Sequence, residues 1–136
     1  MLRKKYQQEN IIIEDFIDFA FIMPRTDLYI TNGGYGGTLI AIDHALPMVA
    51  AGINEGKNEI CARIGYFKLG INLNTEKPGP PKIKKAVTQI ISTPVYKENV
   101  EKLRDEFRSY DTNKLAADLI LSVVQNKVTP NLLSES

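Results

Sequence analysis

Residues 28–42 read Leu28-Tyr29-Ile30-Thr31-Asn32-Gly33-Gly34-Tyr35-Gly36-Gly37-Thr38-Leu39-Ile40-Ala41-Ile42. Four glycines fall within five positions, between a short apolar run and a helix-compatible run that we expect to begin at Thr38. Glycine lets a backbone turn tightly and approach a ligand closely. A helix that begins after the turn points unpaired N–H groups and the positive end of its dipole at the same place. The pattern indicates either a phosphate-binding turn after a parallel strand or a glycine-rich hairpin loop without a ligand.

The residues on either side of this stretch alternate between short apolar runs and amphipathic ones. We expect strands at 10–13, 28–31, 47–51 and 71–73, because each is a short apolar run bounded by turn residues. Between them we expect a short helix or turn at 19–23, a helix at 38–44, and a helix at about 55–64 capped by Asn54. This alternation predicts an α/β fold, a Rossmann-like parallel sheet with helices on both faces and right-handed crossovers.

Further helices are expected at the two ends of the chain. Residues 2–8 have the character of the end of a helix. After a proline-containing loop at 74–81, apolar residues recur at helical spacing over 82–91 and over 96–107, and Pro81 suits the first position of the earlier helix. Asp111 or Thr112 can cap a last helix. Its apolar stripe consists of Leu115, Leu119, Ile120 and Val123.

Composition argues against several classes of function. The 136 residues include 17 basic and 16 acidic ones, and this net charge of +1 gives no electrostatic case for binding nucleic acid or an anionic membrane surface. The N-terminus is polar and no apolar run reaches the length of a membrane span, so we expect a cytoplasmic protein. Cys61 is the single cysteine and His44 the single histidine, which gives neither an internal disulfide nor metal-site spacing. We therefore expect no metal and no cofactor.

The run from Thr31 to Ala41 resembles the donor-binding signature of family-one glycosyltransferases, the UDP-glucosyl and UDP-glucuronosyl transferases and their macrolide-modifying bacterial relatives. That family has Thr-His-x-Gly-x-x-Ser/Thr at this turn, followed by a helix, by Gly-x-Pro opening a strand, and by an acidic residue with Gln. This chain continues with Leu46-Pro47-Met48-Val49-Ala50-Ala51-Gly52, Glu55-Gly56-Lys57, Ala62-Arg63-Ile64-Gly65 and Gly70-Ile71-Asn72-Leu73. Order and spacing match over roughly residues 10 to 110. The resemblance implies the later part of the C-terminal domain of a GT-B glycosyltransferase without its first two strands, followed by C-terminal helices.

The resemblance also implies which residues hold a UDP-sugar. The residues at the diphosphate are Asn32, Gly33, Gly34, Gly36, Gly37 and Thr38, and the N–H groups of the last three can serve whatever their side chains. Phe16 and Ile17 stand where the family contacts uracil. Gly56 and Lys57 stand at the pair that bonds the hexose hydroxyls, and Glu55, one residue earlier, could also accept a hydrogen bond from the sugar. For each group a plain alternative remains: a turn residue at Asn32, core packing at Phe16, helix capping at Glu55.

The chain departs from the family pattern at two positions of the signature. Asn32 stands where the family has a His that contacts the donor phosphates, so an amide donor replaces a positive charge. Ile40 stands at the family's ribose-binding Glu, and we leave the ribose contact unassigned. We interpret His44 as a residue at a helix C-terminus, far from the glycine turn. No catalytic residue and no metal ligand is assigned, since the family's catalytic His and its partner Asp belong to an acceptor domain without a counterpart here.

The resemblance implies the donor-binding portion of an enzyme that transfers a hexose from a UDP-sugar to an acceptor hydroxyl. Residues 1–126 would form a partial nucleotide-sugar-binding domain and 127–136 a flexible tail, and the lone chain, as a truncated product or one subunit of a split enzyme, should be inactive. In a sheet of order 3-2-1-4-5-6 the strand at 10–13 loses its neighbour and the strand at 28–31 becomes an unpaired edge. We therefore expect an acceptor-domain polypeptide as partner, or self-association through that edge. The alternative is a non-catalytic nucleotide-binding or protein-interaction module.

Overall fold

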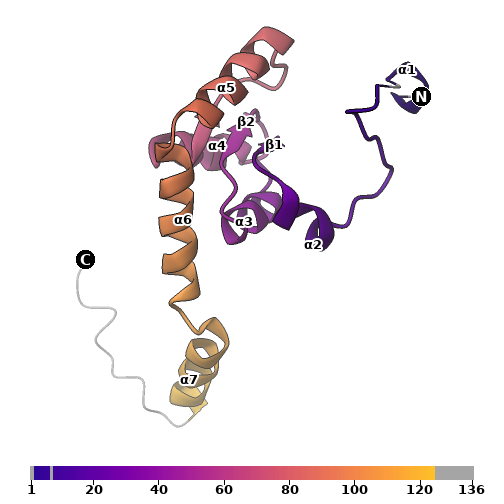
Figure 1. Cartoon of the computed structure of the whole chain (residues 1–136). Helices are drawn as coiled ribbons and strands as arrows, with labels where there is room; N and C mark the ends of the chain where they lie inside the picture. Colours follow the sequence, from indigo (N-terminus) through magenta and orange to yellow (C-terminus); the bar gives the residue numbers. More distant parts are fainter. Residues whose placement is uncertain (1, 7, 125–136) are drawn as a thin grey trace.

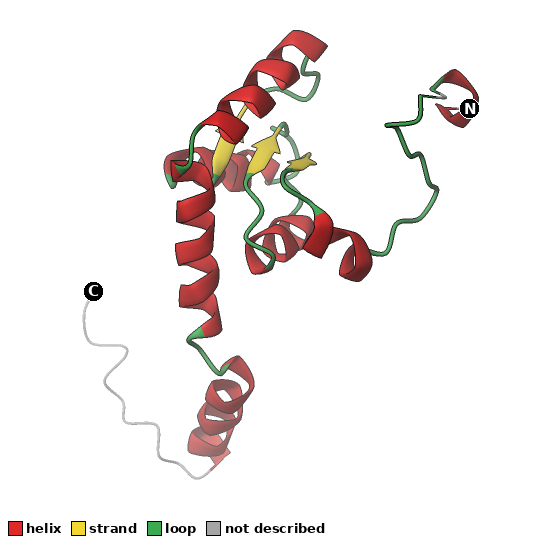
Figure 2. Ribbon diagram, viewed as in Figure 1, coloured by secondary structure: helices red, strands yellow, loops and turns green. Residues whose placement is uncertain are grey.

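The computed structural model of the chain describes residues 2–6 and 8–124. Within them three short strands, β1 (Tyr29–Thr31), β2 (Met48–Ala50) and β3 (Gly70–Asn72), form one parallel sheet in the order β1-β2-β3 (Figure 2). The register pairs Ile30 with Val49 and Val49 with Ile71. Each strand lies within one residue of the limits predicted for it, and the parallel order agrees with the α/β prediction.

Helices or helical turns precede, separate and follow these strands. They are α1 (Leu2–Lys5), α2 (Phe19–Ile22), the 3-10 turn η1 (Met23–Arg25), α3 (Tyr35–Asp43), α4 (Lys57–Tyr66), α5 (Pro80–Ser92), α6 (Val95–Arg108) and α7 (Thr112–Val124). Helix α5 begins with two prolines after Gly79, where the missing N–H groups cost nothing. Asp111 caps α7, since its Oδ1 accepts the N–H of Lys114 at 3.0 Å. Helices therefore form in each segment where one was predicted, with α1 shorter than expected and with shifted limits for α3 and α4.

The sheet lies between two layers of helices (Figure 1). Successive side chains of a strand point to opposite faces. Met48 and Ala50 accordingly pack with buried residues of α3, α4 and α6, whereas Val49 packs with Ala86 and Ile90 of α5. All three β2 residues are fully buried, so β2 is the central strand, and helices cover both of its faces.

The strand predicted at 10–13 does not form. Residues 11–14 are irregular, the side chain of Ile12 is 81% exposed, and the segment runs away from the sheet in Figure 1. An isolated β-branched run has no ladder hydrogen bonds to hold it extended. Among residues 2–6 and 8–124, no strand lies beside it to supply them. The local preference of 10–13 for an extended backbone was identified correctly. A strand there would also need a neighbouring strand, and the described residues provide none.

Exposed apolar side chains of the described residues include those on β1 and on α7. Ile30 on β1 is 52% exposed although its register partner Val49 is fully buried, because no described strand pairs with the outer edge of β1. Helix α7 lies at the end of α6, away from the sheet, with its predicted apolar stripe exposed (Figure 1). The predicted tail at 127–136 lies outside the described residues. None of the described helices has the length and apolarity needed to cross a bilayer.

Candidate functional site

The glycine turn is shaped by two side chains, each of which accepts a hydrogen bond from the backbone N–H two residues later in the chain. Thr31 Oγ1 accepts the N–H of Gly33 at 3.1 Å, and Asn32 Oδ1 accepts the N–H of Gly34, also at 3.1 Å. This arrangement sets Gly34 in an extended conformation as the N-cap of α3. The helix therefore begins at Tyr35, three residues earlier than predicted, despite the low helix propensity of glycine.

The early start of α3 changes which N–H groups are free. Those of Tyr35, Gly36 and Gly37 occupy the first turn and have no acceptor among the described residues. The N–H of Thr38 donates to the carbonyl oxygen of Gly34 at 3.0 Å, and the Thr38 hydroxyl donates to the same oxygen at 2.9 Å. The N–H of Thr38, expected to face a ligand, is thus already bonded within the helix, and the N–H of Tyr35 is the additional free group of this turn.

Gly33 serves close packing between the turn and α4. Its φ is +78°, and a Cβ built on it would overlap the sulfur of Cys61 and lie 3.4 Å from the carbonyl oxygen of Lys57. Gly52 plays a similar part after β2, since a Cβ there would overlap the carbonyl oxygen of Asn32. Gly36 is different, because a Cβ there would meet no atom within 4 Å. Gly33 and Gly52 therefore allow close packing, whereas Gly36 borders open space at the start of the helix.

Cys61 lies beneath this turn and is fully buried. Burial raises the pKa of its thiol, partly opposed by a hydrogen bond from the N–H of Gly52. The thiol is therefore protonated at neutral pH and acts as a small apolar side chain.

The loop before α4 places Glu55 and Lys57 together. Glu55 and Gly56 both adopt left-handed backbone conformations, with φ of 55° and 77°. They delay the helix to Lys57 and make Gly56 its N-cap, so the predicted cap at Asn54 is wrong. Asn54 instead accepts the N–H of Lys57 through its carbonyl oxygen at 3.0 Å. Lys57 Nζ lies 2.7 Å from Glu55 Oε2, and this bond is the main cause that raises the pKa of Lys57.

A cavity of about 430 Å³ joins the two predicted binding segments. Its lining residues are Gly34, Tyr35, Glu55, Gly56, Lys57, Glu59, Ile60 and Arg63. The start of α3 thus faces the Glu55–Lys57 loop across one space. Four of these residues were not predicted, namely Tyr35, Glu59, Ile60 and Arg63. The last three follow Gly56 at spacings of three, four and seven, so a correct helix start would have placed them on this face.

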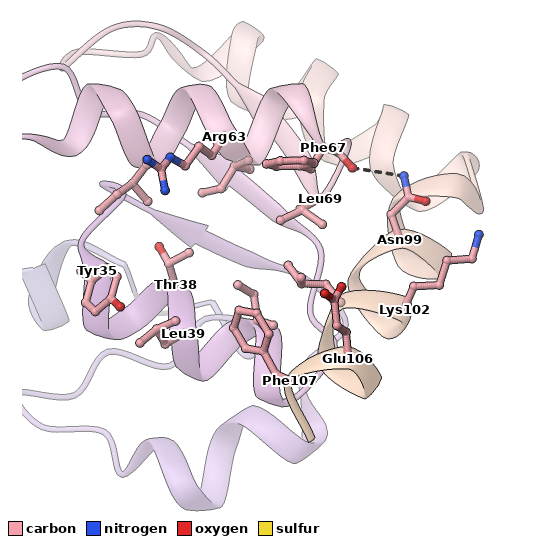
Figure 3. Close-up of a pocket in the computed structure, with 14 residues that line it drawn as sticks. Tyr35, Thr38, Leu39, Arg63, Phe67, Leu69, Asn99, Lys102, Glu106 and Phe107 are labelled. Carbon is pink, nitrogen blue, oxygen red and sulfur yellow. Dashed lines mark hydrogen bonds between the residues drawn. The ribbon is translucent and has the colours of Figure 1, made fainter. Parts of the chain in front are cut away.

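A second, larger cavity of about 500 Å³ lies between α3, α4 and α6 (Figure 3). It shares Tyr35, Ile60 and Arg63 with the first cavity, and Figure 3 shows the Arg63 guanidinium at the same end as Tyr35 and Thr38. Its lining includes Thr38 but none of the other predicted site residues. Ligands of doubly wound sheets bind outside the carboxyl ends of the strands. The smaller cavity, at the ends of β1 and β2, is therefore the candidate site.

Several predicted residues lie apart from this site. Phe16 and Ile17, predicted at the uracil ring, are 83% and 44% exposed, and neither lines the two cavities. Asn32 is exposed beside the turn, with its oxygen bonded to Gly34 and no partner for its amide nitrogen among the described residues. His44 is the C-cap of α3, at the opposite end of the helix from the turn, as interpreted from the sequence.

Comparisons with known proteins identify relatives of this chain. Residues 5–120 match the model of the family described as erythromycin biosynthesis protein CIII-like, C-terminal domain. The chain is 34% identical over 115 residues to 4'-demethylrebeccamycin synthase of Lentzea aerocolonigenes, covering 85% of this chain and 27% of that protein. It is 33% identical over 111 residues to UDP-glycosyltransferase 2 of Phaeomoniella chlamydospora, covering 82% of this chain and 24% of that protein. It is also 30% identical over 118 residues to UDP-glucosyltransferase A1 of Starmerella bombicola, covering 87% of this chain and 26% of that protein.

The fold has a solved counterpart. The glycosyltransferase of kitacinnamycin superimposes with a TM-score of 0.76 at 23% identity, over 82% of this chain and 29% of that one. This likeness confirms the predicted fold class, and the named relatives confirm the resemblance to UDP-glycosyltransferases. The chain spans about a quarter of the length of the three relatives. Because the family model covers most of its residues, the chain belongs to the erythromycin biosynthesis protein CIII-like C-terminal domain family.

Proposed function

We propose that this chain binds the donor of a hexosyl transfer, a UDP-sugar, in the cavity between α3 and α4. The observation that carries the proposal is that one cavity joins the start of α3 to the Glu55–Lys57 loop, in a chain whose relatives include UDP-glycosyltransferases. The diphosphate would lie at the first turn of α3, and the hexose would lie against the loop. This order follows the two segments that the sequence resemblance assigned to phosphate and sugar.

The first turn of α3 offers suitable chemistry for a diphosphate. The free N–H groups of Tyr35, Gly36 and Gly37 point the same way, at the positive end of the helix dipole. Arg63 adds a cation to the cavity lining, and its guanidinium makes no ion pair or hydrogen bond within the described residues. Asn32 can donate through its free amide nitrogen. In this proposal Gly33, Gly34 and Thr38 hold the turn in shape and do not contact the phosphate.

The loop offers hydrogen-bonding groups of both kinds to sugar hydroxyls. Glu55 accepts and Lys57 donates, and their 2.7 Å contact holds them at one place on the cavity wall. Glu59 adds a second carboxylate acceptor to the lining. A hexose presents hydroxyls that act as donors and acceptors, so a mixed lining of this kind suits it better than a uniformly apolar one.

The base that the family resemblance implies is a histidine, and none lines this cavity. An acceptor hydroxyl must lose its proton to a group within hydrogen-bond reach. The single histidine, His44, lies at the far end of α3. We therefore propose that a second polypeptide or domain supplies the acceptor pocket and the base. The exposed apolar groups at Ile30 and along α7 support such a partner or self-association.

Calorimetric titration of the chain with UDP and with uridine tests the proposal. UDP should bind more tightly, because the free N–H groups of α3 recognise phosphate. Gly36→Val should reduce UDP binding most, since a branched side chain would stand where the ligand approaches the helix start. Ala62→Val, at an exposed position of α4 outside both cavities, controls for the helix propensity of valine. Equal affinity for UDP and uridine would rule the phosphate role out.

A further inference from the structure

Glu76 joins the loop after β3 to the loop that carries Glu55 and Lys57. A single oxygen of its side chain, Oε1, accepts the N–H of Ile53 at 2.7 Å and the N–H of Asn54 at 2.8 Å. The partners are more than twenty residues apart in sequence. They meet because β2 and β3 are parallel neighbours whose carboxyl ends emerge at the same edge of the sheet. The N–H of Leu73 continues that pairing to the carbonyl oxygen of Ala50 at 2.8 Å.

The loop held by Glu76 has a conformation that its own sequence does not favour. Glu55 has a φ of 55°, in the left-handed region that a residue with a Cβ seldom adopts, and Gly56 follows at 77°. Such a conformation persists when surrounding contacts determine it. The two N–H groups bonded by Glu76 belong to the residues just before Glu55. Fixing Ile53 and Asn54 therefore fixes the direction in which the chain enters the left-handed pair.

We propose that Glu76 is a positioning residue for sugar recognition, which fixes the 53–57 loop so that Glu55 and Lys57 face the candidate cavity. Glu76 does not line that cavity and would act through the loop alone. A carboxylate suits this role, because an ionised acceptor forms shorter and stronger hydrogen bonds to backbone N–H groups than a neutral one. The inference rests on the proposed donor function and adds a determinant of the sugar half of the site.

The ionisation of Glu76 agrees with this role. The N–H groups of Ile53 and Asn54 hold the pKa of Glu76 below its usual range, and the charge of Lys57 adds to the effect. The carboxylate is consequently ionised at neutral pH. Its charge in turn contributes to the raised pKa of Lys57, after the larger effect of Glu55. The positions of Glu55, Lys57 and Glu76 are thus coupled electrostatically as well as through the backbone.

The test compares UDP and UDP-glucose binding to the full chain and to its Glu76→Ala and Glu76→Gln variants. In Glu76→Ala the affinity for UDP-glucose should fall about tenfold, while the affinity for UDP stays unchanged. A tenfold loss is the low end of the effect that follows when a residue orienting a metal-binding side chain is removed, and Glu76 has the same kind of orienting role here. Glu76→Gln should recover most of the loss, because its amide oxygen can still accept both N–H groups. Glu9→Ala, an exposed loop position, should change neither affinity. A general loss of stability would instead reduce the affinity for UDP and the affinity for UDP-glucose to the same extent.

Amide hydrogen exchange at Ile53 and Asn54, measured by NMR without ligand, reports the anchor independently. Both amides should exchange slowly in the wild type and rapidly in Glu76→Ala. If Glu76→Ala keeps the preference for UDP-glucose over UDP, the inference is overturned. It is also overturned if the wild type shows no such preference, because the loop then does not read the sugar. In that case the comparison of UDP with uridine still decides the donor proposal on its own.

Discussion

Replacing Gly33 by alanine should destabilise this domain, whereas the same replacement at Gly36, three positions on, should not. Gly33 is buried, has a φ of +78°, and faces the sulfur of Cys61 and the carbonyl oxygen of Lys57. Gly36 lies in the first turn of α3, where an added methyl group meets no atom within 4 Å. The two substitutions add the same atoms to the same turn, so their difference isolates backbone conformation and packing.

The expected loss at Gly33 has two parts. A left-handed backbone costs an L-residue about 1–2 kcal/mol. Forcing a methyl group against the Cys61 sulfur and the Lys57 carbonyl costs about 1–3 kcal/mol, as in other overpacked sites. The sum of about 2–5 kcal/mol is a large share of the 5–15 kcal/mol by which native proteins are typically stable. At Gly36, alanine favours the helix by up to about 1 kcal/mol.

Urea unfolding followed by far-ultraviolet circular dichroism measures both variants. With a slope of about 2 kcal/mol per molar, the Gly33→Ala midpoint should fall by about 1–2.5 M, and the Gly36→Ala midpoint should stay or rise. Adding Cys61→Ala to Gly33→Ala removes the overlap but keeps the left-handed strain. In a double-mutant cycle the pair should therefore couple favourably, by about 0.5–3 kcal/mol. Equal midpoints for the two glycine variants, or zero coupling, would refute the reasoning.

Three further outcomes follow from the structure. Because Glu76 has a pKa below its ordinary 4.5, the stability that its carboxylate provides is present above pH 4.5 and lost as the pH falls through the lower folded-state value, so urea midpoints of the wild type and Glu76→Gln should approach each other only below pH 4.5. His44→Ala should leave UDP affinity unchanged by calorimetry, and a loss would give His44 a role at the site. The chain should self-associate in light scattering across a concentration series, and Ile30→Lys should reduce this by charging the open edge; a wild type that stays monomeric at every concentration would contradict it.

The parts of the fold that follow from local pattern were predicted well. The strand around Val49 is apolar throughout because helices cover both of its faces, and that property is visible in the sequence. Helix α6 showed its periodicity equally clearly, and its Val100 is fully buried as that spacing requires. In both segments the residues that form the element also supply the contacts that stabilise it, so no distant partner had to be known.

The errors share a different cause, which is dependence on distant residues. The strand at 10–13 needed a neighbouring strand, and none lies beside it among the described residues. The start of α4 follows the left-handed conformation of Glu55, and the N–H groups of the two residues before it bond Glu76, more than twenty residues later. The start of α3 depends on bonds from the side chains of Thr31 and Asn32, which outweigh the low helix propensity of two glycines.

The geometry of α3 also bears on which group could remove the proton in the proposed reaction. The helix has nine residues, so at 1.5 Å per residue its two ends lie about 13 Å apart. A base must lie within about 3 Å of the proton it removes, or reach it through one water. His44, at the C-terminal end, therefore cannot serve an acceptor at a sugar whose diphosphate is held at the N-terminal end. With the diphosphate at the proposed position, the same helix thus keeps the single histidine away from the reacting hydroxyl, so a histidine base has to come from outside this site.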